Sequence, residues 1–281
     1  MKQPELYERF RALHEQDGGV VMPNPWDGVS ALLLKQAGFL ALGSSSAAIA
    51  FSLGRLDGAH AVSMVEALEN AALLGRLTGL PINADLEDGF GPAPEDCATT
   101  VKAAIKAGMA GVGIEDTTAN PEKPMHDFDH AVERIRQAAR VAKGRIMLTG
   151  RTDNYLFGRP DLDDTIRRLT AFAEVGADVL YAPLLPDMDA IRAVVKAVAP
   201  KPVNVLIGPG TGPVPIADLQ AAGVRRVSLG AALYCHVMAS LQEAATALAG
   251  GNIAPAAAGI WPSKIMGLIG NATAKTASSR V

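Results

Sequence analysis

The chain has 281 residues, of which 49% are hydrophobic and 5% aromatic, and its formal net charge at pH 7 is −3. This nearly balanced charge gives no electrostatic reason to expect a nucleic acid or an anionic membrane surface as a partner, so we expect a small-molecule ligand. With only Cys97 and Cys235 present, neither a disulfide framework nor a zinc site is indicated. No apolar run approaches the ~18 residues of a membrane span, and no signal segment is recognisable, so we expect a soluble cytoplasmic protein.

The first element in chain order is an amphipathic segment over residues 5–16, which predicts a helix ahead of the first strand. Eight short apolar runs follow and predict strands at residues 19–22, 39–42, 81–84, 111–114, 145–148, 178–181, 202–206 and 226–229. Amphipathic segments of helical spacing separate them. A glycine that ends a helix by tolerating positive φ is expected at Gly38, Gly79, Gly108, Gly144, Gly176 and Gly223.

Eight strand-then-helix units indicate an α/β protein with a closed (β/α)₈ TIM barrel, formed by a single domain over residues 1–281. A doubly wound sheet usually has five or six strands and often a Gly-rich turn after the first, which is missing here. The N-terminal extra helix is expected to plug the barrel bottom, and residues 238–249 to form the last helix. We expect a C-terminal helical extension over residues 253–281, with irregular chain after Ile253 and a mobile tail from residue 272. Its apolar segment around Trp261 packs either on its own barrel or on a neighbouring subunit.

Polar residues end most of the predicted strands, and in a barrel these ends converge on one face. They are Trp26, Asp27, Ser44, Ser45, Ser46, Asp85, Glu87, Asp88, Glu115, Asp116, Arg151, Asp153, Tyr181 and Asn204. Several carboxylates in one small space require a cation, and hard oxygen donors favour Mg²⁺ or Mn²⁺. For Asp88, Asp116 and Asp153, a role as helix N-cap is an equal alternative.

A cationic anchor is expected at Arg151, whose guanidinium can hold a substrate carboxylate with two parallel hydrogen bonds. The alternative is that Arg151 only neutralises the surrounding acids. The turn formed by Ser44, Ser45 and Ser46 leads into a helical run, so it forms either a cradle for an anion or an ordinary capped turn.

An ordered set of motifs now gives a family resemblance. They are Asn24-Pro25-Trp26-Asp27, Gly38-Phe39, the serine turn with Leu53-Gly54 and Asp57, Ala84-Asp85 with Gly89-Phe90-Gly91, Ile114-Glu115-Asp116, and Arg151-Thr152-Asp153. Together they resemble the isocitrate lyase / phosphoenolpyruvate mutase superfamily over about residues 21–229. As a set they are specific, although none is so alone.

The resemblance implies that Asp85 binds Mg²⁺ directly or through water, and that Asp57 and Glu115 support the metal-bound waters. It implies that Trp26 and the three serines contact the substrate, whose carboxylate the serines hold, and that Arg151 and Asn204 contact other substrate oxygens. It also implies a homodimer or homotetramer in which the C-terminal helix is exchanged between subunits.

Three departures from the family pattern concern the chemistry. The usual Asp-Ala-Asp is here Asn83-Ala84-Asp85, and Glu87 is expected to supply the missing charge. The loop after the fourth strand lacks the Cys that transfers a proton in the lyases; His126 or Lys123 either replaces it or is merely solvated. The Lys and Asn of the phosphonate-forming mutases are not reproduced at the expected spacing.

We therefore expect a Mg²⁺-dependent lyase-type enzyme, with Arg151, Glu115 and His126 as catalytic candidates. It would cleave or decarboxylate a C–C bond of a small 2-oxo or 2-hydroxy carboxylate through an enolate that the metal stabilises. One alternative is phosphoryl transfer, as in a phosphoenolpyruvate mutase or phosphonopyruvate hydrolase. Another is a barrel that binds a 2-oxo acid without turning it over.

Overall fold

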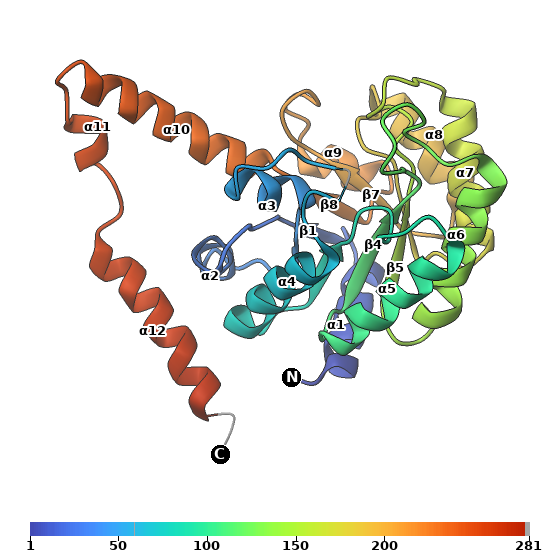
Figure 1. Cartoon of the computed structure of the whole chain (residues 1–281), viewed down its shortest axis with the longest axis horizontal. Helices are drawn as coiled ribbons and strands as arrows, with labels where there is room; N and C mark the ends of the chain where they lie inside the picture. Colours follow the sequence, from blue (N-terminus) through green and yellow to red (C-terminus); the bar gives the residue numbers. More distant parts are fainter. Residues whose placement is uncertain (59, 279–281) are drawn as a thin grey trace.

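The computed structural model describes residues 1–58 and 60–278, and its centre is a barrel of eight parallel strands (Figure 1). The strands are β1 Val20–Met22, β2 Leu42–Gly43, β3 Ile82–Asp85, β4 Gly111–Glu115, β5 Met147–Arg151, β6 Val179–Tyr181, β7 Val203–Leu206 and β8 Arg226–Ser228. Their order is β1-β8-β7-β6-β5-β4-β3-β2, and every pair is parallel. A hydrogen bond from Gly43 N–H to the Pro23 carbonyl, 3.1 Å long, bridges β2 and the end of β1, so the barrel is nearly closed.

Helices follow the strands and surround the barrel. They are α1 Gln3–Glu15, α2 Gly28–Gln36, α3 Ser46–Ser52, α4 Met64–Thr78, α5 Pro94–Lys106, α6 Phe128–Ala142, α7 Leu162–Glu174, α8 Met188–Val198, α9 Ile216–Ala221, α10 Ala232–Ala249, α11 Ala254–Ala257 and α12 Pro262–Ser278. The six glycines predicted to end helices all have positive φ, between 67° and 112°. The predicted (β/α)₈ fold is confirmed.

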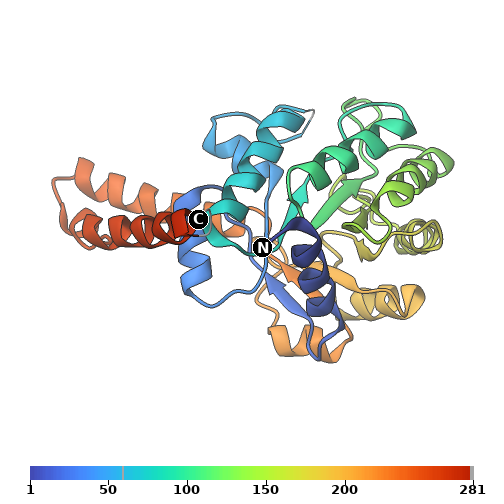
Figure 2. The same cartoon turned by 90° about the horizontal axis from the view of Figure 1, so that it is seen from below.

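Helix α1 closes the bottom of the barrel, as the sequence predicted (Figure 2). Its side chains Phe10 and Leu13 are buried against residues at the amino-terminal ends of the strands, among them Val20, Met147 and Val179. Gly111 on β4 makes room for this contact, since a Cβ there would stand 2.6 Å from the Phe10 ring. The open end of the barrel is therefore the opposite one, where the strands end.

Two strand boundaries were predicted wrongly. The second strand was expected at residues 39–42 but comprises Leu42 and Gly43, because residues 39–41 lead up to the sheet and Leu40 is exposed. The fifth was expected at 145–148 but runs from Met147 to Arg151 and pairs with β4 up to Glu115. The side chains of Glu115 and Arg151 are consequently held at neighbouring positions of the sheet.

The predicted C-terminal helical extension is confirmed, and only the irregular course expected after Ile253 was predicted wrongly. Helices α10, α11 and α12 form an arm that projects from the barrel (Figure 1). Pro262 begins α12, where its missing N–H costs nothing, and α12 packs along α2 and α4. The expected mobile tail is helical as far as Ser278, and residues 279–281 lie outside the described residues. Among the described residues, no helix is long and apolar enough to cross a membrane.

Candidate active site

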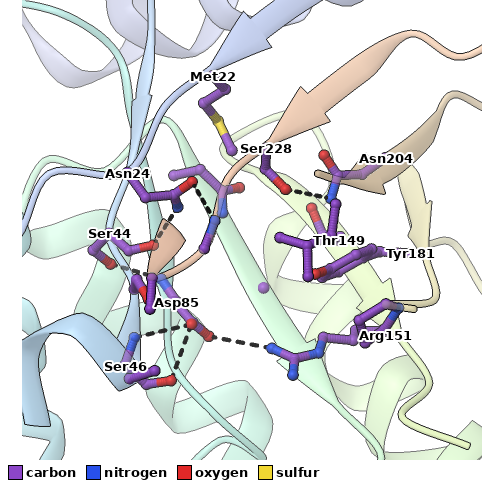
Figure 3. A pocket seen from close by; sticks show the side chains of 18 of the residues that line it. Met22, Asn24, Ser44, Ser46, Asp85, Thr149, Arg151, Tyr181, Asn204 and Ser228 are labelled. Atoms are coloured by element: carbon purple, nitrogen blue, oxygen red, sulfur yellow. Dashed lines mark hydrogen bonds and ion pairs between the residues drawn. The ribbon is translucent and has the colours of Figure 1, made fainter. Parts of the chain in front are cut away.

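A cavity of about 190 Å³ opens at the carboxyl ends of the strands (Figure 3). This is smaller than the roughly 300–1,000 Å³ of pockets that hold drug-sized ligands, so it suits a small molecule. Polar side chains from most of the strands or their following loops line it, namely Asn24, Ser44, Ser45, Ser46, Asp57, Asn83, Asp85, Thr149, Arg151, Tyr181, Asn204, Arg226 and Ser228. The sequence had placed Ser44–Ser46, Asp57, Asp85, Arg151 and Asn204 in one site, and the fold brings them to one cavity.

The serine turn after β2 holds Asp85 in place. Ser46 donates two hydrogen bonds to Asp85 Oδ2, from its N–H (3.0 Å) and its hydroxyl (3.1 Å). The hydroxyl of Ser44 accepts a hydrogen bond from the Asp85 N–H at 2.9 Å. Ser45 caps α3 by accepting from Ala48 N–H. The turn is thus both a helix cap and a support for the carboxylate that ends β3.

Arg151 stands across the cavity from Asp85 and is surrounded by acids (Figure 3). Its Nε and Nη2 donate to the two carboxylate oxygens of Asp153 at 2.6 and 2.8 Å. Its Nη1 lies 2.8 Å from Glu115 Oε2 and 3.9 Å from Asp85 Oδ1. The Tyr181 ring lies 5.3 Å from the guanidinium. Both sequence alternatives for Arg151 remain open, because it neutralises acids and also lines the cavity.

Negative charge accumulates around Asp85. Burial, followed by the charges of Asp85 and Asp57, raises the pKa of Glu87 to about 7, against the hydrogen bond from the backbone N–H of His60. Desolvation and the charge of Asp85 likewise raise the pKa of Asp57. Burial raises the pKa of Glu115 well above its usual value, against the effect of Arg151. The negative charges of neighbouring carboxylates make it harder for each of them to ionise. A bound cation would remove this repulsion and stabilise the site.

The donor set fits a strongly hydrated divalent ion. Within residues 1–58 and 60–278, no three His, Cys, Asp or Glu side chains already converge as a complete ligand cage. Mg²⁺ does not need such a cage, since it usually keeps several waters and takes one or two carboxylates. Asp85 is the carboxylate placed to bind directly, because Ser46 engages only its Oδ2. Asp57 and Glu87, which share its electrostatic field, would act through water.

Three acids that follow strands have structural partners, but none of them caps a helix. Asp116 accepts from Thr152 Oγ1 (2.7 Å), from Asp153 N–H (3.0 Å) and from Arg168 (3.0 Å), which ties the ends of β4 and β5 together. Asp88 accepts from Phe90 N–H and pairs with His60 at 2.6 Å. The N-caps of α5, α6 and α7 are Ala93, Asp127 and Asp161, so the capping alternative for Asp88, Asp116 and Asp153 is wrong.

Four predicted site residues do not line the cavity, namely Trp26, Glu87, Glu115 and His126. Of these, Glu115 contacts the cavity-lining Arg151. The Trp26 ring packs edge-to-face against Tyr234 on α10, with centroids 5.3 Å apart. His126 is half-buried in the loop after β4, and its ring lies beside that of His130 with centroids 4.6 Å apart. Burial lowers its pKa to about 4, with further effects from Arg134 and His130. The catalytic role of His126 and the substrate contact of Trp26 therefore stay predictions that this conformation does not favour.

Sequence reasoning missed Arg226, the first residue of β8, which lines the cavity and is only 2% exposed. Its signal was an arginine inside the predicted strand 226–229, an otherwise apolar run. Thr149 and Ser228 were missed as well, because single hydroxyls within strands carry no pattern. All three are inward-facing members of β5 and β8.

Comparison with known proteins gives a consistent assignment. A family model described as phosphoenolpyruvate phosphomutase matches residues 10–249. The 2-methylisocitrate lyase of Halalkalibacterium halodurans is 31% identical over 232 residues, covering 80% of this chain and 76% of that protein. A crystal structure described as that of a lyase/mutase from Burkholderia cenocepacia J2315 is 43% identical, with a TM-score of 0.90 over 94% of this chain and 95% of that one. Oxaloacetate acetylhydrolase in complex with oxalate is 25% identical, with a TM-score of 0.86 over 99% of both chains.

Proposed function

Because the chain belongs to the phosphoenolpyruvate phosphomutase family, within the isocitrate lyase / phosphoenolpyruvate mutase superfamily of enzymes, we propose that it is a Mg²⁺-dependent lyase. Its reaction would cleave or decarboxylate a carbon–carbon bond of a small 2-oxo or 2-hydroxy carboxylate through an enolate. Mn²⁺ is the alternative ion, because it accepts the same oxygen donors. The 2-methylisocitrate lyase and oxaloacetate acetylhydrolase relatives support this class of reaction.

The observation that carries the proposal is the pairing of an anionic and a cationic group at the mouth of one small cavity. Asp85, fixed by Ser46, faces Arg151 at 3.9 Å. A divalent ion at Asp85 would polarise the 2-oxo or 2-hydroxy oxygen and stabilise developing negative charge. Arg151 would hold the neighbouring carboxylate, and its ion pairs with Glu115 and Asp153 fix its orientation before substrate arrives.

The proton-transfer group differs from that of the thiol-dependent lyases, since the loop after β4 has no cysteine. Tyr181 lines the cavity, and burial raises the pKa of its phenol, so this hydroxyl stays protonated and able to donate at neutral pH. Glu115 is a second candidate, because burial raises its pKa well above the usual range and it contacts Arg151 in the cavity wall. Tyr181 lines the cavity, whereas Glu115 and His126 do not.

A substrate panel tests the proposal. Pyruvate, glyoxylate and oxalate release is measured from 2-oxo and 2-hydroxy diacids with Mg²⁺, and Asp85→Ala is the negative control. We expect turnover of at least one diacid by the wild-type protein and a loss of at least about 100-fold in Asp85→Ala. If no member of the panel turns over, the proposal fails.

Phosphoryl transfer is the second candidate, because the matching family model is that of a phosphomutase. The ³¹P NMR spectrum of phosphonopyruvate incubated with enzyme and Mg²⁺ decides this candidate, since an unchanged spectrum removes it. A binding protein is identified by a different result. Calorimetry would show that 2-oxoglutarate or oxaloacetate binds in the presence of Mg²⁺, while neither the diacids nor phosphonopyruvate are turned over.

We also propose that the arm pairs with a second copy of this chain in a homodimer or homotetramer. Large apolar side chains are exposed along it, including Leu241, Ile253, Ile260, Trp261 and Met266, with Trp261 75% exposed. A groove between the arm and α2 is lined by Leu33, Trp261 and Leu268. Large apolar side chains exposed along one element are typical of an interface between subunits.

A further inference from the structure

A second cavity, of about 250 Å³, lies beside the active-site cavity, and the chemistry proposed above gives it no role. The loop after β6, helix α8 and the loop after β7 enclose it, and most of its lining is aliphatic. Two polar lining residues already have partners, since Asp187 caps α8 and Thr211 Oγ1 bonds to the backbone of Gly208. This apolar cavity therefore offers contacts to a hydrocarbon group.

The apolar cavity and the active-site cavity share a wall. Leu206, the last residue of β7, lines both of them. Before it on the strand, Asn204 lines the active-site cavity and Val205 lines the apolar cavity, as expected because successive side chains of a strand point to opposite faces. In the loop after β6, Pro183 likewise lines the active-site cavity and Ala182 the apolar cavity. The two cavities thus lie on opposite sides of the same stretch of chain.

Side chains rather than sheet form the upper part of this wall. The pairing of β6 with β7 ends at Tyr181 and Asn204, below the level of Leu206. On the other side, Leu206 is paired with Ser228 of β8. Its Cδ1 lies 3.1 Å from where a Cβ on Gly230 would stand, and Gly230 also lines the active-site cavity. The Leu206 side chain therefore closes the space between the end of β6 and the loop after β8.

Leu206 lies at the end of the active-site cavity that is remote from Asp85. In the closed strand order, β7 is opposite β3, with three strands between them on either side. Asp85 ends β3, and Leu206 ends β7. Asn204, two residues before Leu206, lies across the cavity from Asp85 (Figure 3). A ligand that is held at Asp85 and extends across the cavity therefore meets β7.

We propose that Leu206 is the residue that limits the chain length of the substrate, because it separates the apolar cavity from an aliphatic chain in the active site. The proposal rests on the proposed function, since it places the 2-oxo or 2-hydroxy carboxylate at Asp85 and Arg151. The substrate class is then a short-chain acid. With a smaller residue at position 206, each methylene that enters the apolar cavity would raise the affinity about 4-fold.

A pair of 2-oxo acids tests the inference in the wild-type protein by calorimetry at saturating Mg²⁺. The ligands are 2-oxobutyrate and 2-oxooctanoate, which differ only by four methylenes in the chain. We expect 2-oxooctanoate to bind about 10-fold or more weakly than 2-oxobutyrate, because its chain meets the wall at Leu206. Binding of 2-oxooctanoate as tight as that of 2-oxobutyrate, or binding of neither acid, would overturn the inference without any variant.

Variants then assign the limit to Leu206. In Leu206→Ala, 2-oxooctanoate should bind about 10-fold or more tightly than in wild type, with the affinity for 2-oxobutyrate unchanged. Leu206→Val removes less of the side chain and should give a smaller gain, and it serves as the test if Leu206→Ala does not fold. Ile207→Ala is the matched control, since Ile207 lines the apolar cavity but not the active-site cavity.

The control enlarges the apolar cavity and leaves the wall in place, so it should keep the wild-type preference for the short acid. Affinity for 2-oxooctanoate that stays at the wild-type level in the folded Leu206 variants would contradict the inference. An equal gain in Ile207→Ala would contradict it as well, because the gain would not depend on the wall.

The outcomes separate this inference from the proposed function, because binding is measured independently of turnover. A chain-length limit that shifts in Leu206→Ala, in a protein that turns over no member of the diacid panel, would support the inference and refute the function. Turnover of a diacid by a protein that binds both 2-oxo acids equally would do the reverse.

Discussion

At the scale of single residues, the site depends on charges that hold one another in place. Arg151 contacts Asp153 through two nitrogens and Glu115 through the third, at 2.6 to 2.8 Å. Removing one member of such a buried cluster leaves the others unpaired, so its residues act as a unit. The sequence located Arg151, Glu115 and Asp85 because each ends a strand. It could not show that Arg151 binds two acids, because that depends on the register of β4 against β5.

Arg151→Lys tests whether the geometry of the guanidinium, beyond its charge, is required. A lysine has no planar fork to bond both oxygens of Asp153 and reach Glu115 as well. We expect kcat/KM to fall about 100-fold or more, from the loss of charge-assisted hydrogen bonds. Arg167→Lys is the matched control, because Arg167 also bonds an acid but its side chain is 59% exposed. Unchanged kinetics in Arg151→Lys would show that Arg151 only balances charge.

At the scale of elements, helix α1 gives the barrel a sealed bottom. His14 on its buried face is 3% exposed, and its Nδ1 lies 2.8 Å from the Phe10 carbonyl. Burial and, to a smaller extent, the charge of Arg226 lower the pKa of His14 to about 3. The plug is therefore electrostatically linked to Arg226, the first residue of β8.

The pH dependence of stability tests this buried state of His14. In the unfolded chain His14 is protonated below about pH 6.5, whereas in the folded protein it stays neutral down to about pH 3. The free energy of unfolding therefore falls as the pH decreases through this window. Between pH 6.5 and 5, His14 should account for about 2 kcal/mol. Urea unfolding at several pH values should show a smaller decrease in His14→Gln than in wild type.

The control for that experiment is His236→Gln, since His236 is exposed on α10. It should retain the wild-type decrease in the free energy of unfolding. If His14→Gln and wild type lose stability equally between pH 6.5 and 5, His14 is not held neutral in the folded protein.

The ends of helices were predictable from sequence where the backbone conformation of a single residue determines them. All six junction glycines end helices with positive φ, because few other residues tolerate that conformation. The bounds of α12 within the predicted helical extension were not predictable, because Gly267 and Gly270 interrupt its pattern and its position depends on contacts with α2 and α4. Trp26 was placed in the site from its neighbours in sequence, whereas its partner Tyr234 lies more than 200 residues away. Such long-range contacts leave no local pattern.

At the scale of the whole molecule, the barrel and the arm have different surfaces. The barrel buries a continuous apolar core between strands and helices. In contrast, α10 has no buried residue, and its exposed side chains include Val237, Leu241 and Leu248. A helix of this composition is stable in water only when another surface covers it. The arm therefore supports the proposed association of subunits.

Light scattering after size-exclusion chromatography tests this association. We expect the wild-type protein to elute as a dimer or tetramer, and Trp261→Asp to weaken association about 30-fold or more, by loss of a large buried aromatic contact. Ile216→Asp is the matched control, because this exposed apolar residue lies on α9, outside the arm. A monomeric wild-type protein would refute the proposal.

The most direct test of the central claim measures the rate of substrate cleavage against the concentration of free Mg²⁺, using the best substrate of the panel. We expect the rate to rise with Mg²⁺ to saturation, to be abolished by EDTA and to be restored by added Mg²⁺. The rate should be at least about 100-fold lower in Asp85→Asn and unchanged in Asp189→Asn, whose side chain is 92% exposed. Cleavage at the full rate in EDTA, or by Asp85→Asn, would contradict this claim.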